Sequence, residues 1–289
     1  MKQTPMGGET MDNAQGERTK KPDRSRLFLA YTAIAFAISW AIEIPLALKR
    51  QGLLSADVPF SIHYLAAFGP GIAGIVLTWR EKGLPGLKEL LLRLFKWRVN
   101  AVWWIVAVSP LLLFLLIAFT EGFMRGTPPD FRILNHFDFL PHMGVAVVLV
   151  WLATYGFGEE IGWRGYLLPR LQRDRSAWSA SVILWLIWAT WHAPSFFYLQ
   201  TVSGVGTLLG FLIGVLAGSI FLTWLYNSSG GSILLVAVWH GLFDYVTACT
   251  ECKSGLVAAI GSTLVMVWAV VIVVIFKRPN LSPKERQML

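Results

Sequence analysis

The stretch LVAAIGSTLVMVWAVVIVVIF, residues 256–276, contains no charged side chain and is as long as a helix that crosses a lipid bilayer. Apolar runs of similar length recur along the chain, separated by polar connections. A spanning helix needs about 20 mostly apolar residues. We therefore predict eight membrane-spanning helices, at residues 27–48, 61–79, 102–120, 143–171, 178–199, 205–226, 232–248 and 256–276.

The overall composition also favours a membrane protein. Only 15% of the 289 residues are charged, and the mean hydropathy is +0.56. A soluble domain carries about 25% charged residues, so lipid must solvate much of this chain. Many of the 14 Trp lie near the ends of apolar runs, as is typical of side chains at membrane interfaces. We expect an all-α, multi-pass integral membrane protein.

Basic residues predict the orientation of the helices. The net charge is +8, and most Lys and Arg lie in four segments: 1–26, 80–98, 170–175 and 277–286. The positive-inside rule makes these segments, and hence both termini, cytoplasmic. Lys49 and Arg50 are a mild exception. Orientation and contact with lipid headgroups explain the charge, so nucleic acid is not an expected partner.

Residues 86–97, GLKELLLRLFKW, have a different pattern. Leucines and Phe95 fall on one helix face, and charged residues fall elsewhere. This pattern indicates an amphipathic helix lying in the membrane interface, with contact to a partner protein as the alternative.

The fourth predicted span contains the first group of charges, in the sequence Gly158-Glu159-Glu160-Ile161-Gly162-Trp163-Arg164. Glu160 and Arg164 are four residues apart, so they share a helix face and can form an ion pair. Glu159 lies about 100° around the helix and faces something else. Charges at this depth cost several kcal/mol, by order of magnitude, unless they are paired, hydrated or functional.

The fifth and seventh spans contribute the other polar groups. His192 follows Trp188 by four residues in the fifth span, and His240 precedes Asp244 by four residues in the seventh. Each group alone could be a structural hydrogen bond. Helical rise places Glu159, His192, His240 and Asp244 at similar depths, roughly 14–22 Å from one side of the membrane. We therefore expect them to form one site.

This set of residues supports hydrolysis. A carboxylate beside a His can deprotonate water, and a second His with a neighbouring donor can stabilise an oxyanion. Two His and a carboxylate can alternatively hold Zn²⁺ with an open position for water. Neither H-E-x-x-H nor G-x-S-x-G occurs, which disfavours the usual zinc and serine hydrolase sites.

These motifs resemble those of the CPBP family, which contains the type II CAAX prenyl endopeptidases and the bacterial Abi proteins. The resemblance rests on Glu159-Glu160-x-x-x-Arg164, on Trp188 before His192, and on His240-x-x-x-Asp244. It covers roughly residues 145–248. It implies an eight-span endopeptidase that cleaves next to a prenylated cysteine near the carboxy terminus of a membrane-associated protein, reached from the cytoplasmic side.

The resemblance also implies the role of each residue. Glu159 would be the base that activates water, helped by His192. Glu160 and Arg164 would orient the site, and His240 with Asp244 would form the oxyanion site.

Two positions depart from the common family pattern. Trp188 replaces a frequent Phe, and Asp244 replaces a frequent Asn. An ionised Asp cannot donate a hydrogen bond to an oxyanion. Asp244 must therefore be protonated, orient His240, or bind a metal. A Zn²⁺ site formed by Glu159, His192, His240 and Asp244 stays open beside a metal-free mechanism.

We divide the chain into four regions: a disordered cytoplasmic tail (1–26), three spans with their connections (27–141), a catalytic core (142–250), and the last span with a cytoplasmic tail (251–289). No cleaved signal peptide is expected. Cys249 and Cys252 are expected to be an incidental pair, with an extracytoplasmic disulfide as the alternative.

The sequence thus predicts an intramembrane endopeptidase with a hydrated cavity that opens toward the cytoplasm. Two other functions stay open. One is a proton-coupled transporter, since intramembrane Glu, His and Asp also form proton paths. The other is a non-catalytic Abi-type scaffold in bacteriocin self-immunity.

Overall fold

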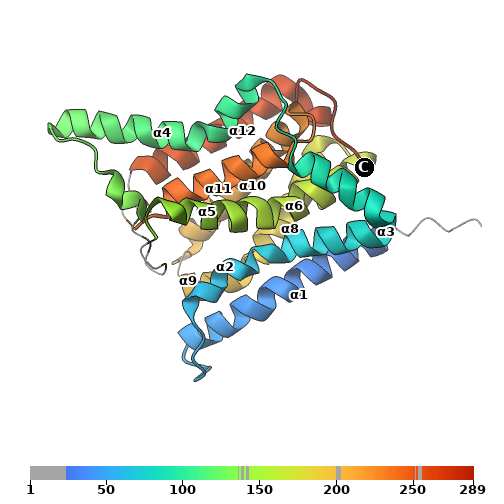
Figure 1. Cartoon of the computed structure of the whole chain (residues 1–289), viewed down its shortest axis with the longest axis horizontal. Helices are drawn as coiled ribbons and strands as arrows, with labels where there is room; N and C mark the ends of the chain where they lie inside the picture. The colour runs from blue at the N-terminus through green and yellow to red at the C-terminus, as the bar shows by residue number, and fades with distance from the viewer. Residues whose placement is uncertain are drawn as a thin grey trace, which may run out of the picture.

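The computed structural model describes residues 24–135, 137, 140, 143–199, 203–250, 252 and 256–289. Within these ranges the regular structure is helical, without strands, and the long helices stand side by side in one bundle (Figure 1). The predicted all-α fold is confirmed. Residues 1–23 of the predicted tail lie outside the described residues.

Within the described residues, six helical segments are long and apolar enough to cross a membrane, which indicates an integral, multi-pass membrane protein. They are Ser25–Arg50, Phe60–Leu94, Ala101–Arg125, Ala177–Leu199, Val205–Ser228 and Leu256–Asn280. Each contains one of the predicted spans; five have similar bounds, whereas Phe60–Leu94 continues well past the predicted end at residue 79. The count of eight is not confirmed: the seventh predicted span is a shorter apolar helix, Ile233–Ala248, and the fourth is not one continuous α-helix.

Figure 1 names the elements that position the site. The long helices are α1 (Arg24–Arg50), α3 (Phe68–Leu94), α4 (Ala101–Arg125), α8 (Ala177–Trp191), α10 (Val205–Ser228), α11 (Ile233–Ala248) and α12 (Leu256–Asn280). The short helices α2 (His63–Ala66) and α9 (Phe196–Leu199) lie before α3 and after α8. α1 packs against α3, α10 against α8 and α12, and α11 against α4.

The fourth predicted span alternates between two kinds of helix. Its elements in chain order are α5 (Val147–Trp151), the π-helix η4 (Leu152–Gly158), α6 (Glu159–Gly162), the π-helix η5 (Trp163–Leu167) and α7 (Leu168–Asp174). π-Helical turns are rare and are frequently found at functional sites. Here they flank the two adjacent glutamates on both sides.

Glycines let the glutamate-bearing segment approach α3 closely. A Cβ on Gly162 would lie 2.2 Å from the carbonyl oxygen of Pro70, and one on Gly71 would lie 2.4 Å from that of Gly158. No larger residue fits at either position without moving backbone. The backbones of α3 and of the glutamate-bearing segment are therefore in direct contact next to Glu159 and Glu160.

Residues 86–94 of the predicted amphipathic segment (86–97) are helical and form the last part of α3, which ends at Leu94. This part is separated from the spanning part by Gly83, whose φ of +59° favours glycine. Arg93 donates from Nη2 to the carbonyl oxygen of Gly165 and from Nη1 to the hydroxyl of Tyr226, both at 2.9 Å. The segment is thereby fixed to the bundle, and its position at a membrane interface stays a prediction.

The two ends of the bundle differ in charge. We call one the basic end: α1 begins there, the chain ends there, and it carries Arg170–Arg175 (Figure 1, right). The opposite end, which we call the far end, is where α1 ends at Arg50 and α11 ends at Ala248. The start of α1 and the carboxy terminus thus share one end of the bundle, as predicted, while the cytoplasmic location of that end stays a prediction.

Cys249 and Cys252 are joined by a disulfide at the far end. The chain turns directly after α11 and brings the two Cα atoms within 4.9 Å, a separation that a disulfide can span. The prediction of an incidental pair is therefore wrong, because the spacing alone did not show that the helix stops before Cys249.

Candidate active site

Glu159 is buried at the start of α6 and is held by two tryptophans. Its Oε2 accepts hydrogen bonds from Nε1 of Trp163 at 3.1 Å and from Nε1 of Trp188 at 2.9 Å. Both indoles can only donate, so they fix one carboxylate oxygen and orient the group. Within the described part of the chain, no hydrogen bond to Oε1 is formed.

Glu160 points to the other side of the helix, as the spacing predicts. Its Oε1 accepts a hydrogen bond from Nη1 of Arg164 at 2.7 Å and lies 2.8 Å from Nδ1 of His240. The side chains of Glu160 and Arg164 are both 0% exposed. The predicted Glu160–Arg164 ion pair is present, and it extends to a residue of α11.

His192 directly follows α8, and its ring has a defined orientation. Nδ1 lies 2.7 Å from the carbonyl oxygen of Trp188, one turn earlier. A carbonyl oxygen can only accept, so Nδ1 carries the hydrogen. In the neutral ring Nε2 is then the basic nitrogen.

His240 and Asp244 share a face of α11. Nε2 of His240 lies 3.5 Å from Oδ2 of Asp244, while Nδ1 of the same ring faces Glu160. The Asp244 side chain is 29% exposed, far more than that of Glu160. His240 therefore lies between one fully buried carboxylate and one at a more open position.

Trp188 is the residue that connects these groups. Its indole binds Glu159, its ring stacks under the guanidinium of Arg164 at 4.9 Å, and it meets His240 edge to face at 5.3 Å. The sequence pointed to Trp188 only as an aromatic before His192, and the role of its N–H was missed. An indole in place of a phenyl ring supplies that donor.

A cavity of about 1500 Å³ brings four of the predicted residues together: Glu159, His192, His240 and Asp244 all line it. Glu160 and Arg164 do not line it and stand behind Glu159 and His240. The lining also includes four side chains able to accept or donate a proton that the sequence analysis did not assign to the site. They are Glu43, His63, Tyr155 and Tyr198.

The cavity extends from the catalytic level to the far end of the bundle. Lys49 and Arg50 line it at the end of α1, Val58 lines it in the loop that follows, and Thr247 and Ala248 line it at the end of α11. Asp57 lies in the same loop, outside the membrane helices; the Lys49 ammonium donates to its carboxylate at 2.7 Å and holds the pKa of that carboxyl below its usual value.

Among the residues that the structure describes, those that line the cavity lie outside the segments of the basic end. A cavity that opens at the far end and a basic end in the cytoplasm would place the opening on the other side of the membrane, so the two predictions about orientation need a direct test.

The donor set does not fit the zinc alternative in this arrangement. Across the described ranges, no three His, Cys, Asp or Glu side chains stand together as a metal site requires. Oε2 of Glu159 is occupied by two indoles, and Nδ1 of His192 binds a carbonyl oxygen. We therefore derive no catalytic step through a metal.

Comparison with known proteins defines the class of protein. Residues 140–246 match the model of the family described as type II CAAX prenyl endopeptidase Rce1-like. The chain is also similar to CAAX prenyl protease 2 of Methanococcus maripaludis, with 27% identity over 211 residues, which cover 66% of this chain and 74% of the archaeal protein.

Residues 140–246 thus match the Rce1-like family, which confirms the family resemblance predicted from the motifs. Together with the helices that can span a membrane, this supports a membrane protease of the CAAX type. The matched segment contains all six predicted site residues: Glu159, Glu160, Arg164, His192, His240 and Asp244.

Proposed function

We propose that this protein is an intramembrane endopeptidase in which Glu159 activates water for attack on a peptide carbonyl. One observation carries the proposal: Glu159 and His192, on different helices, line the same cavity with their orientations fixed by neighbouring groups. A buried, oriented carboxylate is suited to act as a general base.

The hydrogen bonds assign the atoms that would act. Because two indoles occupy Oε2 of Glu159, Oε1 is the oxygen that would take the proton of the attacking water. Nε2 of His192 is the second acceptor in the cavity and would hold the same water. Two acceptors leave the oxygen lone pair of the water directed at the substrate.

His240 and Asp244 are placed to bind the oxyanion. A hydrogen on Nε2 of His240 would face Asp244 at rest and the developing oxyanion during attack. Glu160 fixes the ring from the opposite nitrogen and is itself fixed by Arg164. Of the three roles that the sequence left open for Asp244, orientation of His240 is the one that this geometry favours.

The substrate that we propose is the carboxy-terminal segment of a prenylated, membrane-associated protein. The family description and the name of the archaeal relative point to this class. The cavity wall supports it, because the side formed by α10 and α12 is apolar and would accept a lipid chain. Its lining residues there include Phe211, Val215, Val265 and Met266.

The test is cleavage of prenylated and unprenylated membrane peptides by the purified protein in detergent, with and without a zinc chelator. We expect cleavage by the wild type and a loss of at least about 100-fold in kcat in Glu159→Gln, in which the amide oxygen can still accept from both indoles. Glu121→Gln on α4, outside the cavity lining, is the matched control.

The outcomes separate the alternatives. Cleavage that resists the chelator supports the metal-free mechanism, whereas loss that added zinc reverses would support a metal bound by Glu159, His192, His240 and Asp244. Wild-type activity in Glu159→Gln would contradict the proposed base. Absence of cleavage together with proton flux in liposomes would favour the transporter.

A further inference from the structure

A second group of polar side chains lines the same cavity, close to the proposed catalytic residues. Glu43 of α1, Tyr198 of α9, His63 of α2 and Tyr155 of η4 form one continuous chain of hydrogen bonds. The hydroxyl of Tyr198 lies 2.9 Å from Oε1 of Glu43 and 2.6 Å from Nδ1 of His63, and Nε2 of His63 lies 2.7 Å from the hydroxyl of Tyr155. The mechanism proposed above uses none of these residues.

The number of hydrogens fixes the direction of every bond in this chain. Each tyrosine hydroxyl and the neutral imidazole has one hydrogen to donate. When Glu43 is ionised, Tyr198 donates to it, Nδ1 of His63 donates to Tyr198, and Tyr155 donates to Nε2 of His63. The oxygen of Tyr155 then presents only lone pairs to the cavity.

A proton on Glu43 reverses the whole chain. Glu43 then donates to Tyr198, Tyr198 to Nδ1 of His63, and Nε2 of His63 to Tyr155. The hydrogen of Tyr155 is released to face the cavity. A proton that enters at Glu43 can therefore leave at Tyr155 without movement of any heavy atom.

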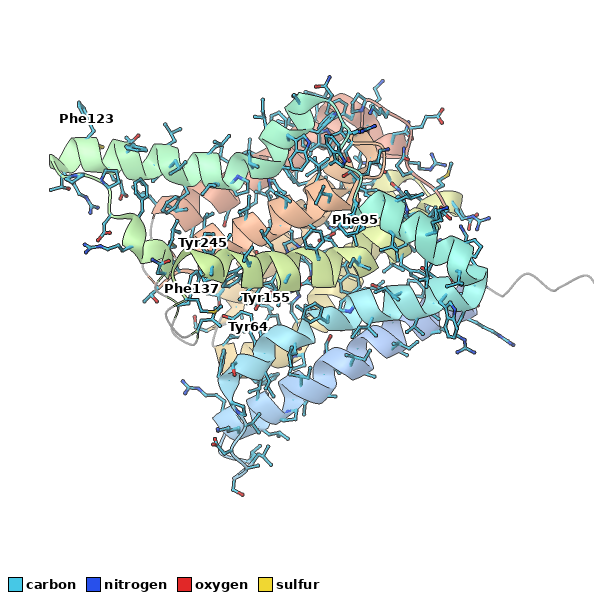
Figure 2. The ribbon with its side chains drawn as sticks, viewed as in Figure 1. Tyr64, Phe95, Phe123, Phe137, Tyr155 and Tyr245 are labelled. Atoms are coloured by element: carbon cyan, nitrogen blue, oxygen red, sulfur yellow. A yellow bond between two sulfur atoms is a disulfide. The ribbon has the colours of Figure 1, made fainter. Side chains whose placement is uncertain are left out.

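The chain ends close to the catalytic groups. Tyr155 lies four residues before Glu159 in the same helical segment, and both line the cavity. Tyr155 interacts electrostatically with Glu159 and with Asp244, and His63 does so with His192. Figure 2 shows Tyr155 beside Tyr64 within the bundle, and their ring centroids are 6.1 Å apart.

A purely structural role explains this chain poorly. Glu43 is only 2% exposed, and its Oε2 has no hydrogen-bond partner among the residues that the structure describes. A buried polar atom without a partner costs free energy, so a carboxyl retained only to join helices would be expected to have both oxygens bonded.

We propose that Glu43, Tyr198, His63 and Tyr155 form a proton relay that protonates the leaving amine. This inference rests on the proposed peptidase function. When water attacks, its oxygen bonds to the carbonyl carbon, its proton goes to Glu159, and the C–N bond breaks. The amine nitrogen takes a proton from Tyr155, which is refilled from His63, then Tyr198, then Glu43.

The protons balance in this step. Glu159 gains one proton and Glu43 loses one, and exchange through the hydrated cavity restores both groups. Tyr155 is the member that would touch the substrate, and the other three are positioning residues that act through it.

The test compares Tyr198→Phe, which cuts the chain at its centre and keeps the ring, with the wild type and with Tyr64→Phe. Tyr64 contacts the rings of His63 and Tyr155 but is not a member of the Glu43–Tyr198–His63–Tyr155 hydrogen-bond series. We expect kcat of Tyr198→Phe to fall about 100-fold with KM unchanged. For the wild type we expect a curved dependence of kcat on the D₂O fraction, because several protons are transferred in the same step. For Tyr198→Phe we expect this dependence to be linear.

Glu43→Gln is the second variant and should show the same pattern, while Tyr64→Phe should behave as the wild type. A kcat within twofold of the wild type in both chain variants would overturn the relay. A lower kcat together with the wild-type D₂O dependence would also overturn it, and so would a lower kcat together with a lower unfolding temperature. Either result would mean that these hydrogen bonds serve to hold α1 against α9. Failure of the peptidase function itself would be distinct, since the wild type would then cleave nothing.

Discussion

Glu160 and Arg164 form a fully buried ion pair, so removal of one partner should be more damaging than removal of both. In Arg164→Ala the carboxylate of Glu160 loses its guanidinium and keeps only the His240 ring at Oε1. A buried charge without its partner costs about 3–5 kcal/mol. We expect a clear fall in the unfolding temperature of Arg164→Ala in detergent.

The double variant Glu160→Gln/Arg164→Met is the control for this prediction, because it removes both charges and keeps similar volume. Its stability should return to near the wild-type level. Its peptidase activity should stay low, since His240 no longer faces a carboxylate at Nδ1. Equal stability of Arg164→Ala and the wild type would show that the pair contributes little to the fold.

Asp244 offers a test of its role through the residue that the family commonly has there. If Asp244 orients His240 through Nε2, an Asn can still accept that hydrogen bond. We expect kcat of Asp244→Asn to remain within about tenfold of the wild type, and that of Asp244→Ala to fall by about 100-fold. Steady-state cleavage assays measure both; complete loss in Asp244→Asn would show that the charge itself is required.

Residue spacing predicted which side chains would lie together better than it predicted what they would contact. Helical depth was enough to expect Glu159, His192, His240 and Asp244 at one level, because rise per residue is nearly constant. It could not show that Trp188 donates to Glu159, since contacts between spans depend on how the helices pack. His63 was missed for the same reason.

The crossing of α6 and α3 predicts a sensitive position at Gly162. A methyl group there would meet the carbonyl oxygen of Pro70 at 2.2 Å and the hydroxyl of Tyr31 at 2.6 Å. The backbone oxygen cannot move aside as a flexible side chain could. We expect Gly162→Ala to lose about 1–3 kcal/mol of stability or more, seen as a lower unfolding temperature.

Gly206→Ala on α10 is the matched control, because a Cβ at that helical position meets nothing within 4 Å. Ala is the better helix former, so this variant should be as stable as the wild type or slightly more so. If both alanine variants behave alike, close packing at Gly162 does not matter for stability.

In the fourth predicted span, the sequence pattern predicted the location of the segment but not its type of helix. Its apolar run gave the correct location of the segment, but α- and π-helical turns cannot be distinguished by hydropathy. The wider turns of η4 and η5 accompany the close approach of Gly158 and Gly162 to α3. Such a contact depends on a residue far away in the chain, so the local sequence does not specify it.

Three independent features distinguish the two ends of the bundle. The cavity reaches the far end, where the Cys249–Cys252 disulfide also lies, and the basic segments gather at the opposite end. Basic connections favour the cytoplasm, and disulfides persist outside it. The basic segments and the disulfide therefore predict that a cavity opening at the far end would face away from the cytoplasm, which is the opposite of the sequence-based prediction.

This orientation can be tested with cysteines at two exposed positions, Ser55→Cys in the loop after α1 and Arg175→Cys after α7, with Cys249 and Cys252 changed to Ser. In intact cells a membrane-impermeant maleimide should label Ser55→Cys, and Arg175→Cys should react only after permeabilisation. The control is the variant in which Cys249 and Cys252 are changed to Ser and no new cysteine is introduced. The reverse pattern would place the cavity opening in the cytoplasm and favour a cytosolic prenylated substrate. With the expected pattern, the proposed prenylated segment would have to reach the cavity from within the bilayer, past the apolar wall formed by α10 and α12.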